Sequence, residues 1–266
     1  MSIASSQRVT QAAQRAGIWL LIVALWEVAY RLVGWKPWLV PAPSHVFEAL
    51  AAMLTAQTQF LLIGAVFVSA ARLAVGFAVS IVLGTALGLV MWRFKFVDEL
   101  LGPVFLGLQT LPSVCWVPLA ILTFGLSERG ILFVLVLGSF FAVAISLRDG
   151  LRAVPPIYRK AGQMLGARGW RLYSQVILPA AFPSLVSSLR QGFSFAWRSL
   201  MGAELILMLE SRGLGFILHQ AREFADIAQV VAVMLVMVLI GMTVDRFGFA
   251  LLERRVHTRF GLNEDH

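Results

Sequence analysis

Arg72, Arg198 and Glu204 are among the ionisable residues that lie inside long apolar segments of this 266-residue chain. A charged side chain in such a segment is costly, so it usually marks a functional site or a satisfied internal pair. Arginine presents a planar fork of N–H donors that matches carboxylate, sulfonate or nitrate oxygens. Arg72 and Arg198 are therefore candidates for an anion pathway, and an internal salt bridge is the alternative for each.

The helical positions of these residues restrict which of them can pair. At about 100° per residue, Glu204 falls about 40° from Arg190 but about 120° from Arg198 around a helix. Arg198 therefore needs another partner: Glu204 of a second copy, an acid on another helix, water or a passing anion. Gln109 and Trp116 occupy a different apolar segment, where they either line the same passage or pack between helices. Glu204 joins them as a candidate pathway residue.

Several chemistries find no support in the sequence. It contains no GxxxxGK[ST] phosphate loop, no nucleophile elbow and no HExxH zinc motif. The single cysteine excludes an internal disulfide, and the four histidines are too scattered for a metal motif. We therefore assign no catalytic residue, metal ligand or ATP site to this chain. A membrane-embedded enzyme would need clustered reactive groups, which the sequence does not show.

The composition indicates the elements that position these residues. Hydrophobic residues make up 59% of the chain and charged residues 14%, against about 45–50% and about 25% in soluble proteins. Backbone groups must be paired within lipid, and segments this apolar favour helices over barrel strands. We expect an all-α polytopic membrane protein, a single domain over 1–266, with six transmembrane helices at about 17–34, 63–92, 102–124, 130–148, 183–208 and 228–252.

The distribution of basic residues predicts the orientation. With the N-terminus in the cytoplasm, fourteen Lys and Arg residues fall on the cytoplasmic side and five outside, and such a bias orients bacterial membrane proteins. Both termini and the 149–182 loop are then cytoplasmic. The same placement explains the net charge of +8 without a nucleic-acid partner. No small-residue cleavage site follows the first span, so we expect it to be retained.

Local signals add four expectations. Ser44 is expected to cap a short external helix, and Glu27 and Arg31 to pair at a spacing of four residues. Gly84-Thr-Ala-Leu-Gly88 is a GxxxG pattern, for which packing within the chain is favoured over a dimer contact. Pro112 and Pro118 each remove a backbone donor, so they can kink the third span or break it along a substrate path.

The cytoplasmic loop contains a basic, helix-prone segment from Tyr158 to Pro179 with a glycine thirteen residues before its proline. It resembles the EAA coupling loop of ABC-importer permeases, a short helix that binds in a groove of an ATPase subunit. Lys160 occupies the glutamate position of that motif and Gly162 its second alanine. The resemblance implies coupling roles for Lys160, Ala161, Gly162, Leu165, Gly166, Ala167 and Pro179. We also expect Gly166 to supply a backbone turn or a close backbone approach, and Pro179 to end the loop helix before the fifth span.

The resemblance extends over nearly the whole chain, from Val40 to the Glu253-Arg-Arg255 tail. Its marks are Leu111-Pro112, Trp116-Val-Pro118, Phe124-Gly125, Ala203-Glu204, Gly213-Leu-Gly-Phe216 and Ala221-Arg-Glu223. They are most similar to the branch that carries aliphatic sulfonates, taurine and nitrate.

Membership of that branch implies a type I permease fold in the inner membrane that works by alternating access. It also implies a second copy of the chain, two cytoplasmic ATPase subunits that hold ATP and Mg, and an extracytoplasmic solute-binding protein. Carriage of a pyrimidine-type vitamin precursor is the alternative within the branch. An ion-coupled secondary transporter is a more distant alternative, since the sequence shows no internal repeat.

Overall fold

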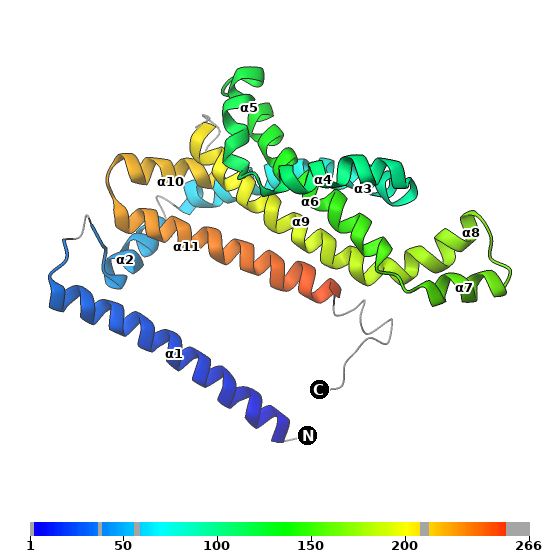
Figure 1. The fold of residues 1–266 in the computed structure, drawn as a ribbon. Coiled ribbons are helices and arrows are strands. Elements are labelled where there is room, and N and C mark those ends of the chain that lie inside the picture. Colours follow the sequence, from blue (N-terminus) through cyan, green and yellow to red (C-terminus); the bar gives the residue numbers. More distant parts are fainter. Residues whose placement is uncertain (1–2, 37–38, 56–58, 208–212, 254–266) are drawn as a thin grey trace. The chain divides into compact units, whose positions relative to one another are not determined.

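A computed structural model describes residues 3–36, 39–55, 59–207 and 213–253, and every regular element among them is a helix. This confirms the predicted all-α class. Figure 1 shows the elements: α1 (Ile3–Val33), α2 (Pro43–Met53), α3 (Gln59–Arg93), α4 (Lys95–Thr110), η1 (Ser113–Trp116), α5 (Val117–Phe124), α6 (Glu128–Arg152), α7 (Pro156–Met164), α8 (Trp170–Leu172), η2 (Tyr173–Ile177), α9 (Leu178–Leu207), α10 (Leu214–Glu223), α11 (Ile227–Thr243) and η3 (Val244–Phe249).

The chain forms two compact units, residues 1–63 with 217–236 and residues 64–216 with 237–266. In the first unit, Glu27 of α1 accepts hydrogen bonds from Arg31 Nε (2.9 Å) and from the Ser44 backbone N–H (3.2 Å). The Glu27–Arg31 pair is confirmed. Ser44 does not cap α2: Pro43 begins the helix after Ala42, and the Ser44 hydroxyl bonds to Glu27 instead. The Glu27 carboxylate thus accepts a hydrogen bond from one of the first N–H groups of α2, which is the usual role of a cap side chain.

The second unit is organised around the antiparallel pair α6 and α9 (Figure 1). Small residues allow these helices to approach closely along their length. A Cβ on Gly138 would overlap the Ser199 side chain, one on Gly192 would lie 2.6 Å from Val143 Cγ2, and one on Gly150 would lie 3.0 Å from Ser184 Cβ. Glycine is needed wherever backbones approach this closely.

Helix α3 packs on α6 through the GxxxG pattern. A Cβ on Gly84 would lie 2.8 Å from Val143 Cγ1, and one on Gly88 would lie 2.7 Å from the Ala144 carbonyl oxygen. Between α3 and α6, the Ser139 hydroxyl donates to Ser80 Oγ at 2.8 Å. Packing within the chain is therefore confirmed for Gly84 and Gly88.

The expected third span, 102–124, is not one continuous helix. Helix α4 ends at Thr110, and the following helical segment, Ser113–Phe124, runs at 101° to it. Leu111 and Pro112 have extended backbone conformations, because a residue before proline is driven out of the helical region. Pro118 causes no break, since it occupies the first turn of α5, where its missing donor is not needed.

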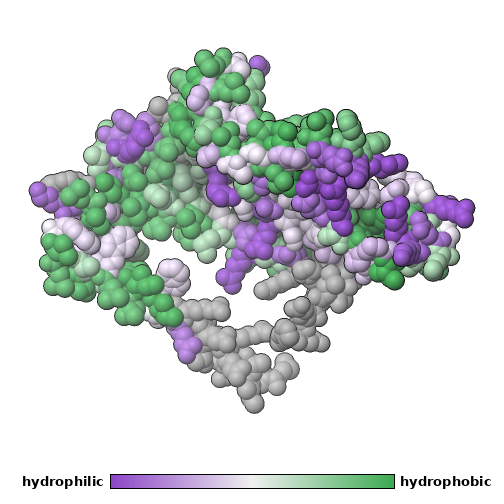
Figure 2. All heavy atoms as spheres, viewed as in Figure 1, coloured by the Kyte–Doolittle hydropathy of each residue, from purple (hydrophilic) through white to green (hydrophobic). Residues whose placement is uncertain are grey.

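Four described helices are long and apolar enough to cross a membrane, or five if the bent pair counts as one span. They are Leu61–Arg93, Glu128–Arg152, Trp170–Leu207 and Ile227–Glu253. The first predicted span falls in α1 except for Gly34, and residue 208 at the end of the fifth lies outside the described residues. In Figure 2 hydrophilic side chains gather where α7, α8 and the start of α4 lie, whereas α5 is largely hydrophobic.

Substitution of Gly88 by alanine is expected to lower the melting temperature of the purified protein in detergent. The new Cβ would collide with the Ala144 carbonyl oxygen, and overpacking of this kind costs about 1–3 kcal/mol. Gly107→Ala is the matched control, because a Cβ there meets nothing within 4 Å. Alanine is favoured over glycine in a helix by about 0.5–1 kcal/mol, so the control should be unchanged or slightly stabilised. Equal melting temperatures for the two variants would contradict the close approach of α3 and α6.

Candidate translocation site and coupling loop

A cavity of about 360 Å³ lies between the bend that follows α4 and the facing sides of α6 and α9. We call it the arginine pocket, because Arg198 lines it together with Gln109 and Trp116. The bend at Leu111-Pro112 positions the last turn of α4 and the 3₁₀ turn η1 on the same cavity. Three of the five residues predicted for the pathway are thus brought together by one structural feature.

Arg198 is exposed and makes its described contacts within its own helix. Its Nε donates to the Ser194 carbonyl oxygen at 3.0 Å, and its guanidinium carbon lies 4.7 Å from the centre of the Phe195 ring. Among the described residues, no carboxylate forms an ion pair with Arg198. Stacking on an aromatic ring orients a guanidinium while its remaining N–H groups can still donate. The arrangement therefore suits recognition of an oxyanion.

Gln109 contributes a second polar group to the arginine pocket. Its Oε1 is buried and has no hydrogen-bond partner among the described residues. Most buried polar atoms in proteins are paired, and unpaired ones recur at functional sites. Trp116 also lines the pocket and packs beside Phe141 of α6, with ring centres 6.4 Å apart. Both alternatives considered for Trp116, lining and packing, are present in the structure.

Arg72 and Glu204 occupy a separate, buried cluster. Arg72 is 6% exposed and Glu204 is 2% exposed, and Arg72 Nη1 donates to Glu204 Oε1 at 2.7 Å. The same guanidinium donates twice to Glu128 at the start of α6, from Nε at 2.8 Å and from Nη2 at 2.6 Å. The internal salt bridge considered for Arg72 is therefore present, and it joins α3, α6 and α9.

Backbone and hydroxyl groups complete the surroundings of Glu204. The Ser69 hydroxyl lies 2.9 and 2.8 Å from the two carboxylate oxygens, and the Gly215 N–H donates to Oε2 at 3.0 Å. A Cβ on Gly213 would lie 2.5 Å from both oxygens. Ser69 and Glu128 were not predicted as partners of Arg72 and Glu204 from the sequence. The Gly213-Leu-Gly motif could have indicated that the backbone approaches Glu204. It follows Glu204 closely, and its two glycines have no side chain that would block the carboxylate.

The segment that resembles a coupling loop folds as two helical segments, α7 and α8, joined by a turn. We keep the name coupling loop for this segment, residues 156–172. Gly166 has φ of +84° and Gly169 has φ of +53°, conformations that other residues adopt only with strain. The Ala167 N–H donates to the Gly162 carbonyl oxygen at 2.9 Å, which closes the end of α7. This confirms that Gly166 forms a turn. Gly162 is buried, and a Cβ there would lie 2.9 Å from Leu172 Cδ1.

The outer surface of the loop is both apolar and basic. Leu165 is 88% exposed, and Met164 and Trp170 are similarly exposed. Lys160 and Ala161 are exposed on α7, and Ala167 is half-buried. Exposed apolar groups surrounded by charge are typical of a surface that binds another protein. Of the residues predicted for coupling, only Gly162 is fully buried, and it packs α7 against α8.

The prediction that Pro179 ends the loop helix is wrong. Residues Trp170–Leu207 form one helical stretch that continues through Pro179. A π-helical turn, η2, precedes the proline, and the Leu178 N–H donates to the Tyr173 carbonyl oxygen. Proline removes a donor and its ring crowds the preceding turn, and a π turn is a common way of adjusting a helix locally. The helix therefore accommodates Pro179 at its start.

Comparisons with known proteins bear on this arrangement. The family described as the binding-protein-dependent transport system inner membrane component matches residues 80–258, well over half of the chain. The chain belongs to this permease family. The permease is therefore a multi-pass membrane protein of a transport system.

Relatives of the permease are named for several small solutes. A nitrate import permease of Synechocystis is 29% identical over 191 residues, covering 72% of this chain and 68% of its own. A Bacillus subtilis protein named for aliphatic sulfonates transport is 30% identical over 236 residues, 89% and 83% of the two chains. A taurine transport permease of Escherichia coli is 28% identical over 242 residues, 90% and 87%. These names confirm the branch that the sequence motifs indicated.

Among solved structures, the MetNI methionine ABC transporter in inward facing conformations matches with a TM-score of 0.64 and 17% identity, over 76% of the permease and 99% of that chain. At this identity the likeness concerns the fold. It confirms the predicted type I ABC-importer permease fold.

Substitution of Arg72 by methionine is expected to destabilise the permease severely. It would leave the buried Glu204 carboxylate without its cation, which typically costs about 3–5 kcal/mol. The melting temperature in detergent should fall, and the double variant Arg72→Met/Glu204→Gln should recover part of the loss. A single variant as stable as the wild type would contradict a structural role for this cluster.

Proposed function

We propose that the permease is the membrane subunit of an ATP-driven importer for a small anion that a solute-binding protein delivers. The observation that carries the proposal is Arg198, which lines the arginine pocket and has no carboxylate partner among the described residues. An arginine in an apolar helix needs a counter-charge. A translocated oxyanion supplies that charge transiently, whereas Arg72 already has Glu128 and Glu204.

The named relatives support an anion as substrate. Nitrate and aliphatic sulfonates are anions, and taurine carries a sulfonate group, so all three present oxygen acceptors that match a guanidinium fork. A pyrimidine-type vitamin precursor remains the second candidate from the sequence motifs, but it gives Arg198 no counter-charge. An ion-coupled secondary transporter has no support from membership in a binding-protein-dependent family.

The energy source in this proposal is a separate polypeptide. The permease would work as two copies with two cytoplasmic ATPase subunits, which bind ATP and Mg, and the exposed surface of α7 and α8 would dock on them. The apolar side chains Met164, Leu165 and Trp170 would enter a groove, and Lys160 would face an acidic or neutral rim. Both termini and this loop would be cytoplasmic, and the arginine pocket would belong to the central pathway.

Copurification of the tagged permease with its genomic neighbours tests the proposal directly. The assembled complex, placed in nanodiscs, should hydrolyse ATP faster when a binding protein loaded with nitrate, taurine or an aliphatic sulfonate is added. Stimulation by one loaded protein would establish the importer and its substrate. Stimulation by a pyrimidine-loaded protein would support the second candidate, and the absence of any associated ATPase would refute the proposal.

Replacement of Arg198 by leucine is expected to reduce anion uptake roughly 10- to 100-fold, because hydrogen bonds to a charged group are worth about 1.5–3 kcal/mol. Assembly with the ATPase should be unaffected, since the described contacts of Arg198 are within α9. Arg129→Leu removes an exposed positive charge at the start of α6 and serves as the control. If Arg198→Leu loses assembly before it loses uptake, Arg198 has a structural role.

Replacement of Gly166 by valine is expected to separate ATP hydrolysis from uptake. No atom lies within 4 Å of a Cβ at this position, so the effect comes from the backbone conformation alone. A β-branched residue is strained at a φ of +84°. Gly166→Asn is the matched control, because asparagine tolerates this conformation. Uptake per ATP should fall in the valine variant and persist in the asparagine variant, and equal coupling in both would contradict the role of the turn.

A further inference from the structure

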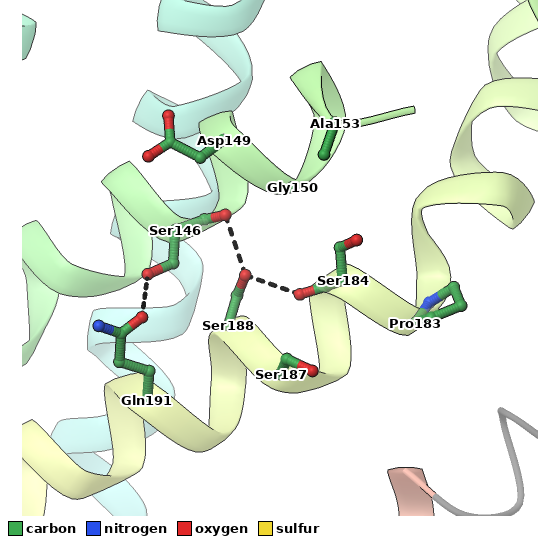
Figure 3. A pocket seen from close by; sticks show the side chains of 9 residues that line it. All are labelled: Ser146, Asp149, Gly150, Ala153, Pro183, Ser184, Ser187, Ser188 and Gln191. Carbon is green, nitrogen blue, oxygen red and sulfur yellow. Dashed lines mark hydrogen bonds between the residues drawn. The ribbon is translucent and has the colours of Figure 1, made fainter. Parts of the chain in front are cut away.

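A second cavity, of about 470 Å³, lies between the end of α6 and the first turns of α9 (Figure 3). We call it the serine pocket, because Ser146, Ser184, Ser187 and Ser188 line it, together with the amide of Gln191. Its lining residues come from the two helix ends that adjoin the coupling loop. Neither the sequence motifs nor the proposed role of Arg198 accounts for this polar cavity within an apolar helix pair.

Internal hydrogen bonds hold the polar groups of the serine pocket in place. The Ser188 hydroxyl lies 2.9 Å from the Ser146 carbonyl oxygen and 2.8 Å from the Ser184 carbonyl oxygen, and the Ser146 hydroxyl donates to Gln191 Oε1 at 2.8 Å (Figure 3). With its oxygen engaged, the Gln191 amide has its N–H groups to offer, and no described residue accepts from them. The Ser146, Ser187 and Ser188 hydroxyls already donate within the chain. The pocket therefore offers the uncharged N–H groups of Gln191 as donors.

The serine pocket and the arginine pocket lie on the same faces of α6 and α9. Along α9, the lining residues Ser184, Ser188, Gln191, Phe195 and Arg198 recur at spacings of three and four, which places them on one side of the helix. On α6, Gly138 lines the arginine pocket and Ser146 the serine pocket, about 12 Å apart at 1.5 Å per residue. One continuous face thus connects the two cavities.

We propose that the serine pocket is a second station for the translocated anion, on the side from which the anion is released. This inference rests on the proposed function. A neutral amide offers an anion hydrogen bonds but no opposite charge, so an anion is held more weakly at Gln191 than by the guanidinium of Arg198. The change, among the described residues, from a lining with an unpaired cation to one without gives the pathway a release end next to the coupling loop.

Charges at the mouth of the serine pocket support weak retention. Asp149 lines the pocket, and its side chain is 56% exposed. Arg148 pairs with it at 2.8 Å and also with Asp98. Ser187 donates to Glu253, which in turn pairs with Arg190. Each nearby cation is therefore matched by a carboxylate, and the pocket has no unpaired positive charge among the described residues to trap an anion.

Opposite charges introduced at Gln191 test the inference. The permease–ATPase complex is prepared in nanodiscs without binding protein, in an Arg198→Leu background that weakens the arginine pocket. Equilibrium binding is measured with whichever of nitrate, taurine or methanesulfonate the wild-type complex imports. Gln191→Lys should tighten binding roughly tenfold and Gln191→Glu should weaken it by a similar factor, because a unit charge at contact distance from the anion acts on the exposed pocket surface, where the effective dielectric constant lies below that of water. Gln220→Lys and Gln220→Glu, exposed on α10, are the control pair.

The outcomes distinguish the inference from the function on which it rests. Dissociation constants that neither Gln191 variant changes, or that both change in the same direction, would overturn the serine pocket as a station. Stimulation of ATP hydrolysis by the loaded binding protein is measured on the wild-type complex in parallel, and its absence would refute the importer itself. If the Gln191 variants fail to assemble, Ser184→Asp is the second variant, and unchanged anion binding there would overturn the inference.

Discussion

The close antiparallel contact between α6 and α9 is the constraint on which the second unit depends. Glycine or serine lies at each close approach, from Gly138 beside Ser199 to Gly150 beside Ser184, so the helices cannot change register without collision. Because of this contact, the coupling loop, the serine pocket and the arginine pocket follow one another along a single pair of helices. A side-chain substitution at one of these contacts is therefore flanked along the helices by other closely packed contacts that cannot easily adjust.

The buried ion pair at the opposite end of the two helices has a different physical character. Removing Arg72 and Glu204 from water is expensive, and a hydrophobic pair of similar size is often at least as stable. The surrounding bonds from Ser69 and Gly215 reduce the cost. The cluster fixes the geometry of three helices around the Glu204 carboxylate. The two arginines therefore differ in their surroundings. Arg72 has its carboxylate partners within the chain, whereas Arg198 is exposed and stacked on Phe195.

The sequence predicted what depends on composition and on residue types with narrow preferences. Apolar length located the helices, the φ preference of glycine predicted the turn at Gly166, and small residues at Gly84 and Gly88 predicted close packing. Prediction from the sequence was wrong where two local conformational preferences compete. Pro179 would end an isolated helix, but a π turn accommodates it, and Ser44 would cap α2, but Pro43 begins that helix earlier. The pairing of Arg72 with Glu128 joins residues far apart in sequence, so no periodicity could show it.

Helical backbone continues from Trp170 to Leu207, with the π turn η2 between the loop and α9. Beyond that turn, close contacts hold α9 against α6 at Ser184, Gly192 and Ser199. Arg198 lies next to the last of these contacts. A displacement of the loop would therefore reach the Arg198 guanidinium only as a joint motion of α6 and α9, and not as a slide of one helix along the other.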